Sequence, residues 1–274
     1  MRDLDCVSFL QWALPQLGFR WPGFRKVRRQ VCRRIARRLH ELELADLEAY
    51  RRHLASHPTE WSHLDGLCRV TISRFCRDRG VFQALGKKVL PALAERARAV
   101  GESRVRVWSA GCGAGEEIYS VALVWHQTVP EVESGLELEL VGTDIDDHQL
   151  ERARRATYPE SCLRELPPEW LDESFTQEPS GEWRLDVDWR RGVRFDHQDI
   201  RTQSPSGLFH LILCRNLAFT YFAEEVQRQV LSRLVTRLAP SGALVIGSHE
   251  SLPAGEWGLV AWDDAPSVVS KISD

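Results

Sequence analysis

The chain passes from a strand into a glycine-rich loop and then into a helix within one short stretch, Arg104–Ser120. This stretch reads RVRVWSAGCGAGEEIYS, in which alternating Val105 and Val107 predict a strand and Glu116-Glu117 open a helix. Glycines at a strand-to-helix turn let the backbone approach a ligand closely, because no Cβ intervenes. The stretch therefore predicts a fold of strands and helices with a nucleotide-like ligand at this turn.

The spacing of the glycines narrows the class of ligand. Gly111-x-Gly113-x-Gly115 is not the G-x-G-x-x-G of dinucleotide sites, and no Gly-Lys-Ser/Thr of a phosphate loop follows. The two glutamates suit the positive end of a helix but would repel a pyrophosphate. We therefore expect a cationic or neutral nucleoside-like ligand, for which S-adenosylmethionine fits and NAD does not.

Composition limits the number of domains and indicates the cellular location of this protein. Its 274 residues allow one large or two smaller domains, and 43% hydrophobic with 27% charged residues is ordinary for a globular protein. The longest apolar runs fall far short of the roughly 20 residues that span a bilayer, and no signal peptide is visible, so no membrane insertion is expected. Seven unpaired-looking cysteines without zinc spacing favour reduced thiols, a cytoplasmic location and no metal site.

Residues 1–85 are predicted to be helical, with one strongly basic helix. Val27, Val31, Ile35 and Leu39 recur every four residues and form one apolar stripe. The stretch from Arg20 to His40 contains nine basic residues and no acid: Arg20, Arg25, Lys26, Arg28, Arg29, Arg33, Arg34, Arg37 and Arg38. Such a run can be a solvated face, but unrelieved like charge also suits an acidic protein helix, RNA or anionic lipid. Further helices are expected over Ala45–Ser56 and Glu60–Phe75.

Beyond residue 85 the pattern alternates between strands and helices. This alternation predicts an α/β fold with a parallel-rich sheet covered by helices on both faces. The last two strands are close enough for an antiparallel hairpin at one edge. Between Tyr158 and Arg194 the rhythm breaks, and an inserted excursion with a small β element is expected. The strands are predicted at Val105–Ser109, Leu136–Thr143, Val193–Asp196, Phe209–Cys214, Ala243–Gly247, Leu259–Trp262 and Ser267–Ile272.

Polar side chains follow several of the predicted strands, where open α/β sheets bind their ligands. Asp144 follows the second strand and could accept hydrogen bonds from a ribose, whereas Asp146 is expected to cap the next helix. Asp199 ends the third strand at a position suited to adenine. Arg215-Asn216 follow the fourth and either face the ligand or hold the loop together. The Gly-Ser-His-Glu run after the fifth strand is expected to belong to the loop framework.

The ordered set of Arg77, SAGCGAGEEIYS, TDID, CRN and GSHESL resembles the CheR family over nearly the whole chain. These chemotaxis receptor methyltransferases esterify receptor glutamates with S-adenosylmethionine, which becomes S-adenosylhomocysteine. The resemblance implies a helical domain over residues 1–85. It also implies a class I, Rossmann-like methyltransferase domain over 86–274, with a small β-subdomain inserted at about 165–195.

The resemblance also implies roles for individual residues. Arg77 and Tyr221 are expected at the reaction centre, with Arg77 near the transferred methyl group and Tyr221 facing the acceptor. The basic helix Arg20–Arg38 is expected to face acidic receptor helices. The residues implied to bind the cofactor are Thr71, Ser73, Arg77, Gly111, Glu117, Asp144, Asp199, Ile200, Arg215 and Asn216.

Departures from the family pattern leave the methyl acceptor open. The loop CRNLAFTYF is one residue longer than the corresponding loop of the family. The family's substrate-facing tyrosine therefore corresponds to Tyr221 only if one residue has been inserted before it. Without an insertion, Thr220 occupies that position. Methylation of a glutamate in a receptor or other acidic protein is the leading hypothesis. A small molecule or another protein side chain as acceptor, and a non-catalytic cofactor-binding adaptor, are the alternatives. RNA is disfavoured because no aromatic stacking motif accompanies the basic run.

Overall fold

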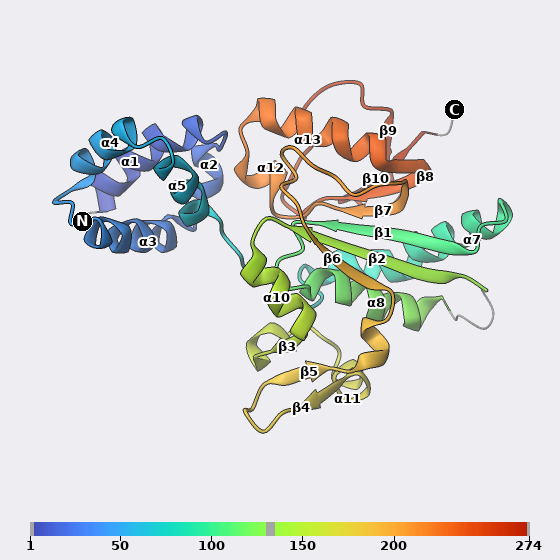
Figure 1. Ribbon diagram of the computed structural model, residues 1–274. Coiled ribbons are helices and arrows are strands. Elements are labelled where there is room, and N and C mark those ends of the chain that lie inside the picture. The colour runs from blue at the N-terminus through green and yellow to red at the C-terminus, as the bar shows by residue number, and fades with distance from the viewer. Residues whose placement is uncertain (1–2, 130–134, 273–274) are drawn as a thin grey trace. The chain divides into compact units, whose positions relative to one another are not determined.

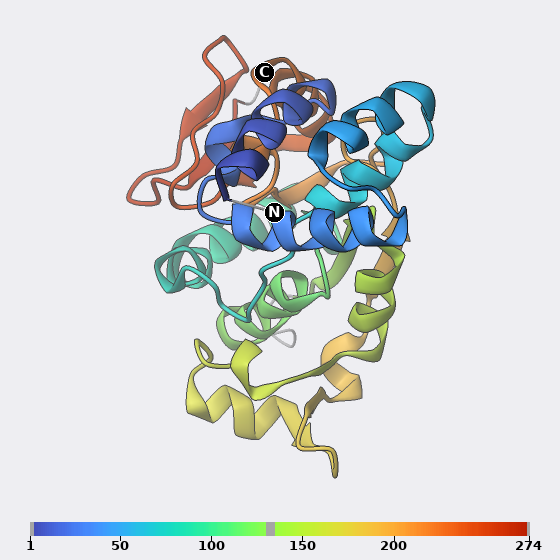
Figure 2. The same cartoon turned by 90° about the vertical axis from the view of Figure 1, so that its left-hand side faces the viewer.

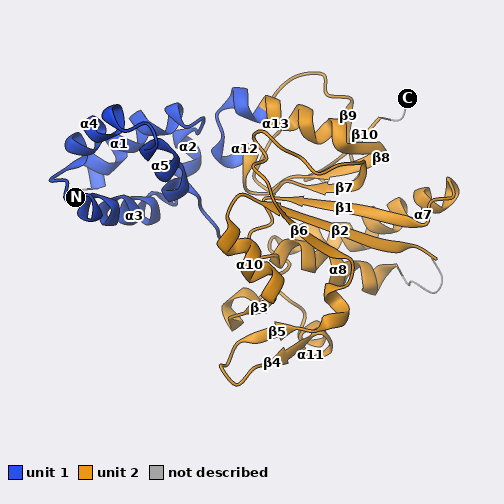
Figure 3. Cartoon of the chain, viewed as in Figure 1, with its two compact units in different colours: residues 1–72, 220–227 blue, residues 73–219, 228–274 orange. Residues whose placement is uncertain are grey.

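The structure, a computed structural model, describes residues 3–129 and 135–272 (Figure 1). Its internal contacts divide the chain into two compact units (Figure 3). The helical unit comprises residues 1–72 and 220–227, and the sheet unit comprises residues 73–219 and 228–274. The units therefore change at Ile72, before the expected domain boundary at residue 85. Whether residues 1–85 and 86–274 are separate folding domains stays a prediction.

The N-terminal part of the helical unit consists of five helices around an apolar core. The basic helix α3, seen side-on in Figure 2, buries Val31, Ile35 and Leu39 of the predicted stripe. Asp46 caps α4, since its side chain accepts a hydrogen bond from the Ala49 amide. The helices are α1 (Asp3–Gln16), α2 (Trp21–Phe24), α3 (Arg28–Glu41), α4 (Leu47–Ser56) and α5 (Glu60–Cys68).

The helix expected over Glu60–Phe75 is shorter than predicted, because α5 ends at Cys68. Arg69 has extended backbone angles, and its carbonyl accepts a hydrogen bond from the Arg34 guanidinium. Three residues that follow, Val70-Thr71-Ile72, are all β-branched and lose side-chain freedom in a helix. The chain therefore leaves the helical unit in an extended conformation.

A disulfide joins Cys6 of α1 to Cys32 of α3 across a sequence separation of 26 residues. The expectation that all cysteines are reduced thiols is therefore wrong for this pair. Their spacing gave no signal, because the two side chains meet only when the two helices pack. The free cysteines in the described part of the chain are Cys68, Cys76, Cys112, Cys162 and Cys214.

The sheet unit contains a seven-stranded sheet in the order β6-β2-β1-β7-β8-β10-β9. The first five strands in this order are parallel, whereas β10 runs antiparallel to both β8 and β9. The predicted α/β class and the antiparallel hairpin at one edge are thus confirmed. The strands are β1 (Arg104–Ala110), β2 (Glu137–Asp144), β6 (Val193–His197), β7 (Phe209–Leu213), β8 (Leu238–Val245), β9 (Leu259–Ala261) and β10 (Val268–Lys271).

Helices cover both faces of this sheet, with α13 on one face and α7, α8 and α10 on the other (Figure 1). Val105 and Val107 of β1 join the core beneath α7 and α8. Trp108, which points to the opposite face, is also fully buried. The elements are α6 (Arg79–Ala84), η1 (Leu85–Val89), α7 (Leu90–Ala99), α8 (Glu116–Thr128), α10 (Asp147–Arg155), α12 (Ala218–Tyr221, ending in the helical unit) and α13 (Glu224–Arg237, beginning there).

A second, three-stranded antiparallel sheet has the order β3-β5-β4. Its strand β3 lies before the expected insertion at 165–195, because Thr157–Tyr158 directly after α10 pair with β5. The elements are β3 (Thr157–Tyr158), η2 (Glu160–Cys162), α11 (Pro168–Ser174), β4 (Phe175–Gln177), β5 (Trp183–Leu185) and η3 (Val187–Arg190). Across residues 3–129 and 135–272, no helix is both long and apolar enough to cross a membrane.

Candidate functional site

The glycine loop at the carboxyl end of β1 is held against the end of β2. The amides of Gly111 and Cys112 both donate to the carbonyl of Thr143, over 2.8 and 2.9 Å. Gly111, Gly113 and Gly115 have φ of +79°, +55° and +90°, a conformation that residues with a Cβ rarely adopt. The loop backbone therefore carries no Cβ at three positions at the edge of the sheet where the strands end.

Asp144 links the end of β2 to this loop. Its carboxylate accepts hydrogen bonds from the Gly113 amide and the Asp146 amide, each over 2.9 Å. Burial of this carboxyl raises its pKa above the usual value, although the backbone amides oppose that effect. Asp146 caps α10 as expected, accepting from the amides of His148 and Gln149. Asp144 is thus a fixed acceptor beside the glycine loop.

Glu117, in the first turn of α8, is held between two donors. The Ser109 hydroxyl donates to its Oε1 over 2.7 Å, and the Arg215 guanidinium donates to its Oε2 over 2.9 Å. The side chain of Glu117 is 14% exposed, so the carboxylate is partly accessible while its orientation is fixed. An anion held in this way suits a cationic ligand group next to the loop.

Arg215 connects three parts of the sheet unit, and its side chain is only 2% exposed. Besides Glu117, its guanidinium donates to the Arg77 carbonyl over 2.7 Å and to the Asp78 carboxylate over 2.9 Å. The guanidinium also lies 5.2 Å from the centre of the Phe82 ring. A buried cation needs such paired partners, because desolvation alone would be costly. The guanidinium therefore holds the loop together instead of pointing freely at a ligand.

The segment Ser73–Asp78, which enters the sheet unit, is anchored at several points. Ser73 hydrogen-bonds the buried carboxyl of Glu116. The Phe75 amide donates to the Cys162 carbonyl, and the Cys76 amide donates to the Ser120 hydroxyl. These bonds, together with the bond from Arg215, fix the backbone that carries Arg77.

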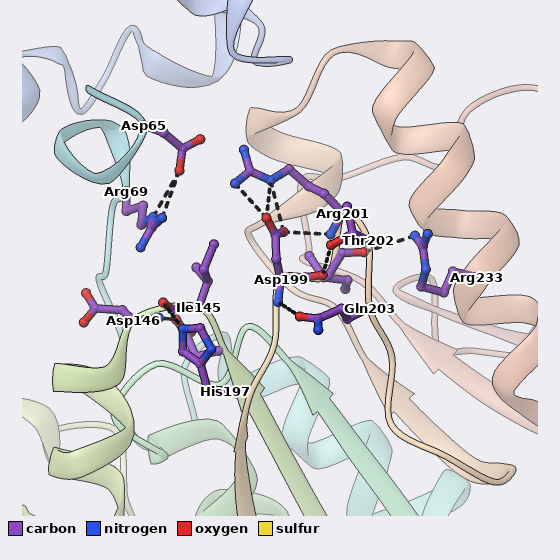
Figure 4. A network of polar contacts seen from close by, with 12 residues as sticks. Asp65, Arg69, Ile145, Asp146, His197, Asp199, Arg201, Thr202, Gln203 and Arg233 are labelled. Atoms are coloured by element: carbon purple, nitrogen blue, oxygen red, sulfur yellow. Dashed lines mark hydrogen bonds and ion pairs between the residues drawn. The ribbon is translucent and has the colours of Figure 1, made fainter. Parts of the chain in front are cut away.

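Asp199, at the end of β6, is engaged by its own neighbours (Figure 4). Its carboxylate forms a two-pronged ion pair with Arg201, whose Nε donates to both oxygens over 3.0 and 2.9 Å. The Asp199 amide donates to the Gln203 side chain, and the carbonyl of buried Ile200 accepts from Arg233. The turn after β6 is therefore preformed, although the Asp199 carboxylate is already paired.

Asn216 follows Arg215 in a left-handed backbone conformation, with φ of +54°. Its amide and the amide of Gly247 both donate to one oxygen of Glu250, over 2.8 and 2.7 Å. Glu250 thus ties the loop after β7 to the loop after β8. This contact confirms the prediction that the Gly-Ser-His-Glu run belongs to the loop framework.

A comparison with known protein families shows to which family this chain belongs. Residues 71–260 match the family model described as CheR methyltransferase, SAM binding domain. The chain belongs to the CheR family. Within that family its sheet and loops form a class I methyltransferase domain, and the protein is an S-adenosylmethionine-dependent methyltransferase.

Individual relatives align over most of the chain. A probable chemotaxis protein methyltransferase from Rhizobium etli is 33% identical over 232 residues, which cover 82% of this chain and 85% of the relative. The chemotaxis protein methyltransferase of Escherichia coli is 31% identical over 231 residues, covering 82% and 77%. An uncharacterized 104.1 kDa protein from Rhodobacter capsulatus is 30% identical over 81% of this chain, which spans only 23% of that protein.

The described geometry fits the cofactor of the CheR family. The glycines adopt left-handed backbone angles, and the carboxylates of Glu117 and Asp144 lie next to the loop that they form. Glu117 could hold an ammonium group, and Asp144 could accept from ribose hydroxyls. Ser73, Gly111, Ile200, Arg215 and Asn216 all belong to the sheet unit, whereas Thr71 and Tyr221 belong to the helical unit. Their individual roles stay predictions.

Two residues beside the glycine loop and Arg215 were not singled out by the sequence analysis. Ser109 orients Glu117, and Asp78 pairs with Arg215. For Asp78 a signal was available, since an acid directly after Arg77 suggests a partner for a nearby cation. For Ser109, a hydroxyl at the end of a buried strand was the corresponding signal.

Proposed function

We propose that this enzyme methylates glutamate carboxylates on an acidic helix of a receptor or similar protein. The relatives from Rhizobium etli and Escherichia coli are named as a probable chemotaxis protein methyltransferase and a chemotaxis protein methyltransferase, which supports this substrate class. The structural observation that carries the proposal is the division of the basic residues of α3 into two rows, one paired inside the unit and one exposed.

The paired row has intramolecular partners. Arg38 donates to both oxygens of buried Glu60 over 2.9 and 2.8 Å, and Arg34 donates to backbone carbonyls, including that of Leu67 over 3.2 Å. The Arg38 guanidinium holds the pKa of the Glu60 carboxyl below its usual value. These arginines stabilise the packing of α3 and are poorly placed to bind a partner.

The exposed row, Arg29, Arg33 and Arg37, repeats every four residues and lies on one face of α3. Arg25 and Lys26, just before the helix, are exposed as well. A row of like charges at this spacing is unfavourable for the isolated helix, and a row of acids on a partner helix would relieve the repulsion. Docking of an acidic helix therefore assigns a role to a feature that folding alone does not require.

The proposed methyl transfer needs no general base. A glutamate with a pKa of about 4.3 is already ionised at neutral pH, so its oxygen can attack without a general base. Bound S-adenosylmethionine supplies the methyl group on a sulfonium. Glu117 and Asp144 would hold it through its ammonium group and ribose, Arg77 would orient the acceptor carboxylate, and the Tyr221 hydroxyl would position it. Asp199 and Ile200 would lie by the adenine.

The exposed row of α3 provides the test of this proposal. With a labelled methyl group and an acidic helical peptide, the triple variant R29A/R33A/R37A should raise the KM for the peptide at least 10-fold and leave cofactor affinity unchanged. Added salt should also raise the KM of the wild-type enzyme for the peptide, because salt screens exposed charges. R52A, which removes an exposed arginine of α4, is the matched control.

The chemistry of the product separates this proposal from its alternatives. A methyl ester is labile to base, whereas methyl groups on nitrogen are not. Transfer of label to a small molecule, or normal cofactor affinity without turnover on any acceptor, would contradict the proposed substrate. Comparison of Y221F with T220V tests which residue faces the acceptor, since only loss of the positioning hydroxyl should lower kcat.

A cytoplasmic location is also proposed. The free cysteines described above support it, because burial raises the pKa of Cys68 and Cys76 to about 12 and keeps these thiols protonated. The Cys6–Cys32 disulfide argues in the opposite direction, so its state in cells decides this point.

A further inference from the structure

The segment Thr220–Gln227 belongs to the helical unit although it lies between two parts of the sheet unit along the chain. Backbone pairing with residues 18–20 holds it there. The Arg20 amide donates to the Tyr221 carbonyl and the Ala223 amide donates to the Gly18 carbonyl, both over 2.8 Å. Phe19 and Phe222 form an isolated antiparallel bridge between these two hydrogen bonds. Residues 221–223 are therefore paired in a fixed register with residues 18–20, just before α2.

Aromatic packing fixes the side chains of the same segment. The ring of Phe24, which is fully buried, meets the ring of Tyr221 edge-on at a centroid distance of 5.1 Å. Phe19 packs against both Phe24 and Phe222, with centroid distances of 5.5 and 5.6 Å. Edge-to-face pairs of this kind have a preferred geometry, so they restrict where the Tyr221 ring can lie.

Gly23 is required by a close approach of backbone to backbone. A Cβ on Gly23 would lie 2.2 Å from the Thr220 carbonyl oxygen and 3.0 Å from its carbonyl carbon. The Arg20 side chain holds that same carbonyl from another direction, with its Nε donating over 3.1 Å. Even an alanine at position 23 must displace the peptide group that precedes Tyr221, because neither neighbour is a flexible side chain.

We propose that Gly23 and Phe24 are positioning residues for Tyr221, and that α2 acts as the brace for the acceptor side of the active site. This inference rests on the proposed function, which places Tyr221 at the acceptor. Only Arg25, Lys26 and Val27 separate α2 from the basic helix α3. One short stretch of chain thus carries both the surface that docks the acceptor protein and the contacts that orient the acceptor tyrosine.

The variants G23A and F24L test the brace, and G66A is the matched control. Gly66 lies in α5 of the same unit, and a Cβ there meets nothing within 4 Å. G23A and F24L should lower kcat for the acceptor peptide by 10- to 100-fold, because small displacements of a positioning group are costly. The KM for the peptide and the affinity for S-adenosylmethionine should change less than threefold, since α3 and the glycine loop are intact.

A double-mutant cycle separates positioning from general damage to the fold. If Gly23 acts through the Tyr221 hydroxyl, G23A should cost little further kcat in a Y221F background. Full additivity of the two losses would overturn the proposal. Equal kcat for G23A and G66A would overturn it as well.

Hydrogen exchange supplies a readout that needs no acceptor. Exchange of the Ala223 amide, which donates to Gly18, should be at least 10-fold faster in G23A than in the wild type and unchanged in G66A. An unchanged Ala223 rate in G23A would show that α2 is no brace. If the wild-type enzyme methylates no acidic peptide, the proposed function and the acceptor role of Tyr221 both fail, while the exchange rates still decide whether α2 holds the segment.

Discussion

Two neighbouring aspartates after β2 show how one residue type performs different tasks at the site. Asp144 is turned toward the glycine loop and holds the Gly113 amide, whereas Asp146 is turned along α10 and caps it. Both carboxylates accept backbone hydrogen bonds, so the distinction depends on direction and burial. We predict that Asp144, and not Asp146, accepts hydrogen bonds from a bound ribose.

Replacement of Asp144 should therefore affect the cofactor far more than replacement of Asp146. D144A should lower the affinity for S-adenosylmethionine, measured by calorimetry, about 100-fold or more, because hydrogen bonds to charged groups are worth about 1.5–3 kcal/mol each. D146A should leave the affinity nearly unchanged and cost about 1 kcal/mol of stability through loss of the cap. Equal affinities for D144A and the wild type would remove Asp144 from the ribose site.

Glu116 offers a test based on pH. Burial raises the pKa of its carboxyl in the folded protein. The folded state therefore binds more protons than the unfolded state between the unfolded pKa, about 4.3, and the raised folded pKa. The contribution of Glu116 to the free energy of unfolding therefore falls as the pH rises through this window.

The variant E116Q cannot ionise and should not share that loss. Relative to the wild type, its free energy of unfolding, measured with urea, should increase between pH 4 and pH 8 by about 1.4 kcal/mol for each unit by which the pKa is raised. E151Q, which alters an exposed glutamate of α10, serves as the control. A difference between E116Q and the wild type that is independent of pH would contradict the prediction.

At the scale of elements, α3 has a structural role, and we propose a docking role for the same helix. One flank is paired with Glu60 and with backbone carbonyls, one face is buried, and Arg29, Arg33 and Arg37 are exposed. The disulfide from Cys6 to Cys32 adds a covalent link between α1 and this helix. The orientation of the docking helix therefore depends on α1 as well as on its own core contacts.

Reduction of this disulfide should destabilise the helical unit. A cross-link across 26 residues destabilises the unfolded chain by about 3.5 kcal/mol on a chain-entropy estimate. Urea unfolding with and without a phosphine reductant should show a loss of that order, and C6A/C32A should be insensitive to the reductant. Alkylation of intact cells before lysis, followed by mass spectrometry, should show both thiols reduced if the enzyme is cytoplasmic.

At the scale of the whole molecule, the chain crosses between its two units three times. It passes from the helical to the sheet unit after Ile72, returns after Phe219 and leaves again after Gln227. The predicted methyltransferase domain over residues 86–274 therefore contains a segment whose backbone partners lie in residues 18–20.

A chain that begins at residue 73 should lose the protection of this segment. Without Gly18 and Arg20, the Ala223 amide and the Tyr221 carbonyl lose their partners, and Phe222 loses the ring of Phe19. Chymotrypsin should therefore cut after Tyr221 or Phe222 at least 10-fold faster in the truncated chain than in the full chain. Equal resistance in both chains would mean that the sheet unit alone orders the segment.

The sequence was most informative where structure depends on neighbours along the chain. The alternating Val105 and Val107, the glycines that follow and the cap at Asp146 are local signals, and each predicted its element. The end of α5 at Cys68 was harder to place, because the polar and apolar pattern continues into Val70-Thr71-Ile72, where the chain is extended.

Contacts between distant segments could not be read in this way. The pairing of Cys6 with Cys32 and the bonds of Arg215 to Glu117 and Asp78 arise only when separate elements pack. The same holds for Tyr221, since nothing near it in sequence reveals that residues 18–24 hold it.

Because Thr220–Gln227 belongs to the helical unit, residues 1–72 cannot be exchanged between family members independently of this segment. A chimaera that replaces residues 1–72 with those of another family member would place a foreign turn against this native segment. If that relative carries a side chain at the position of Gly23, its Cβ would collide with the Thr220 carbonyl and displace the segment. Recombination that preserves activity must therefore transfer two separate stretches of the gene together.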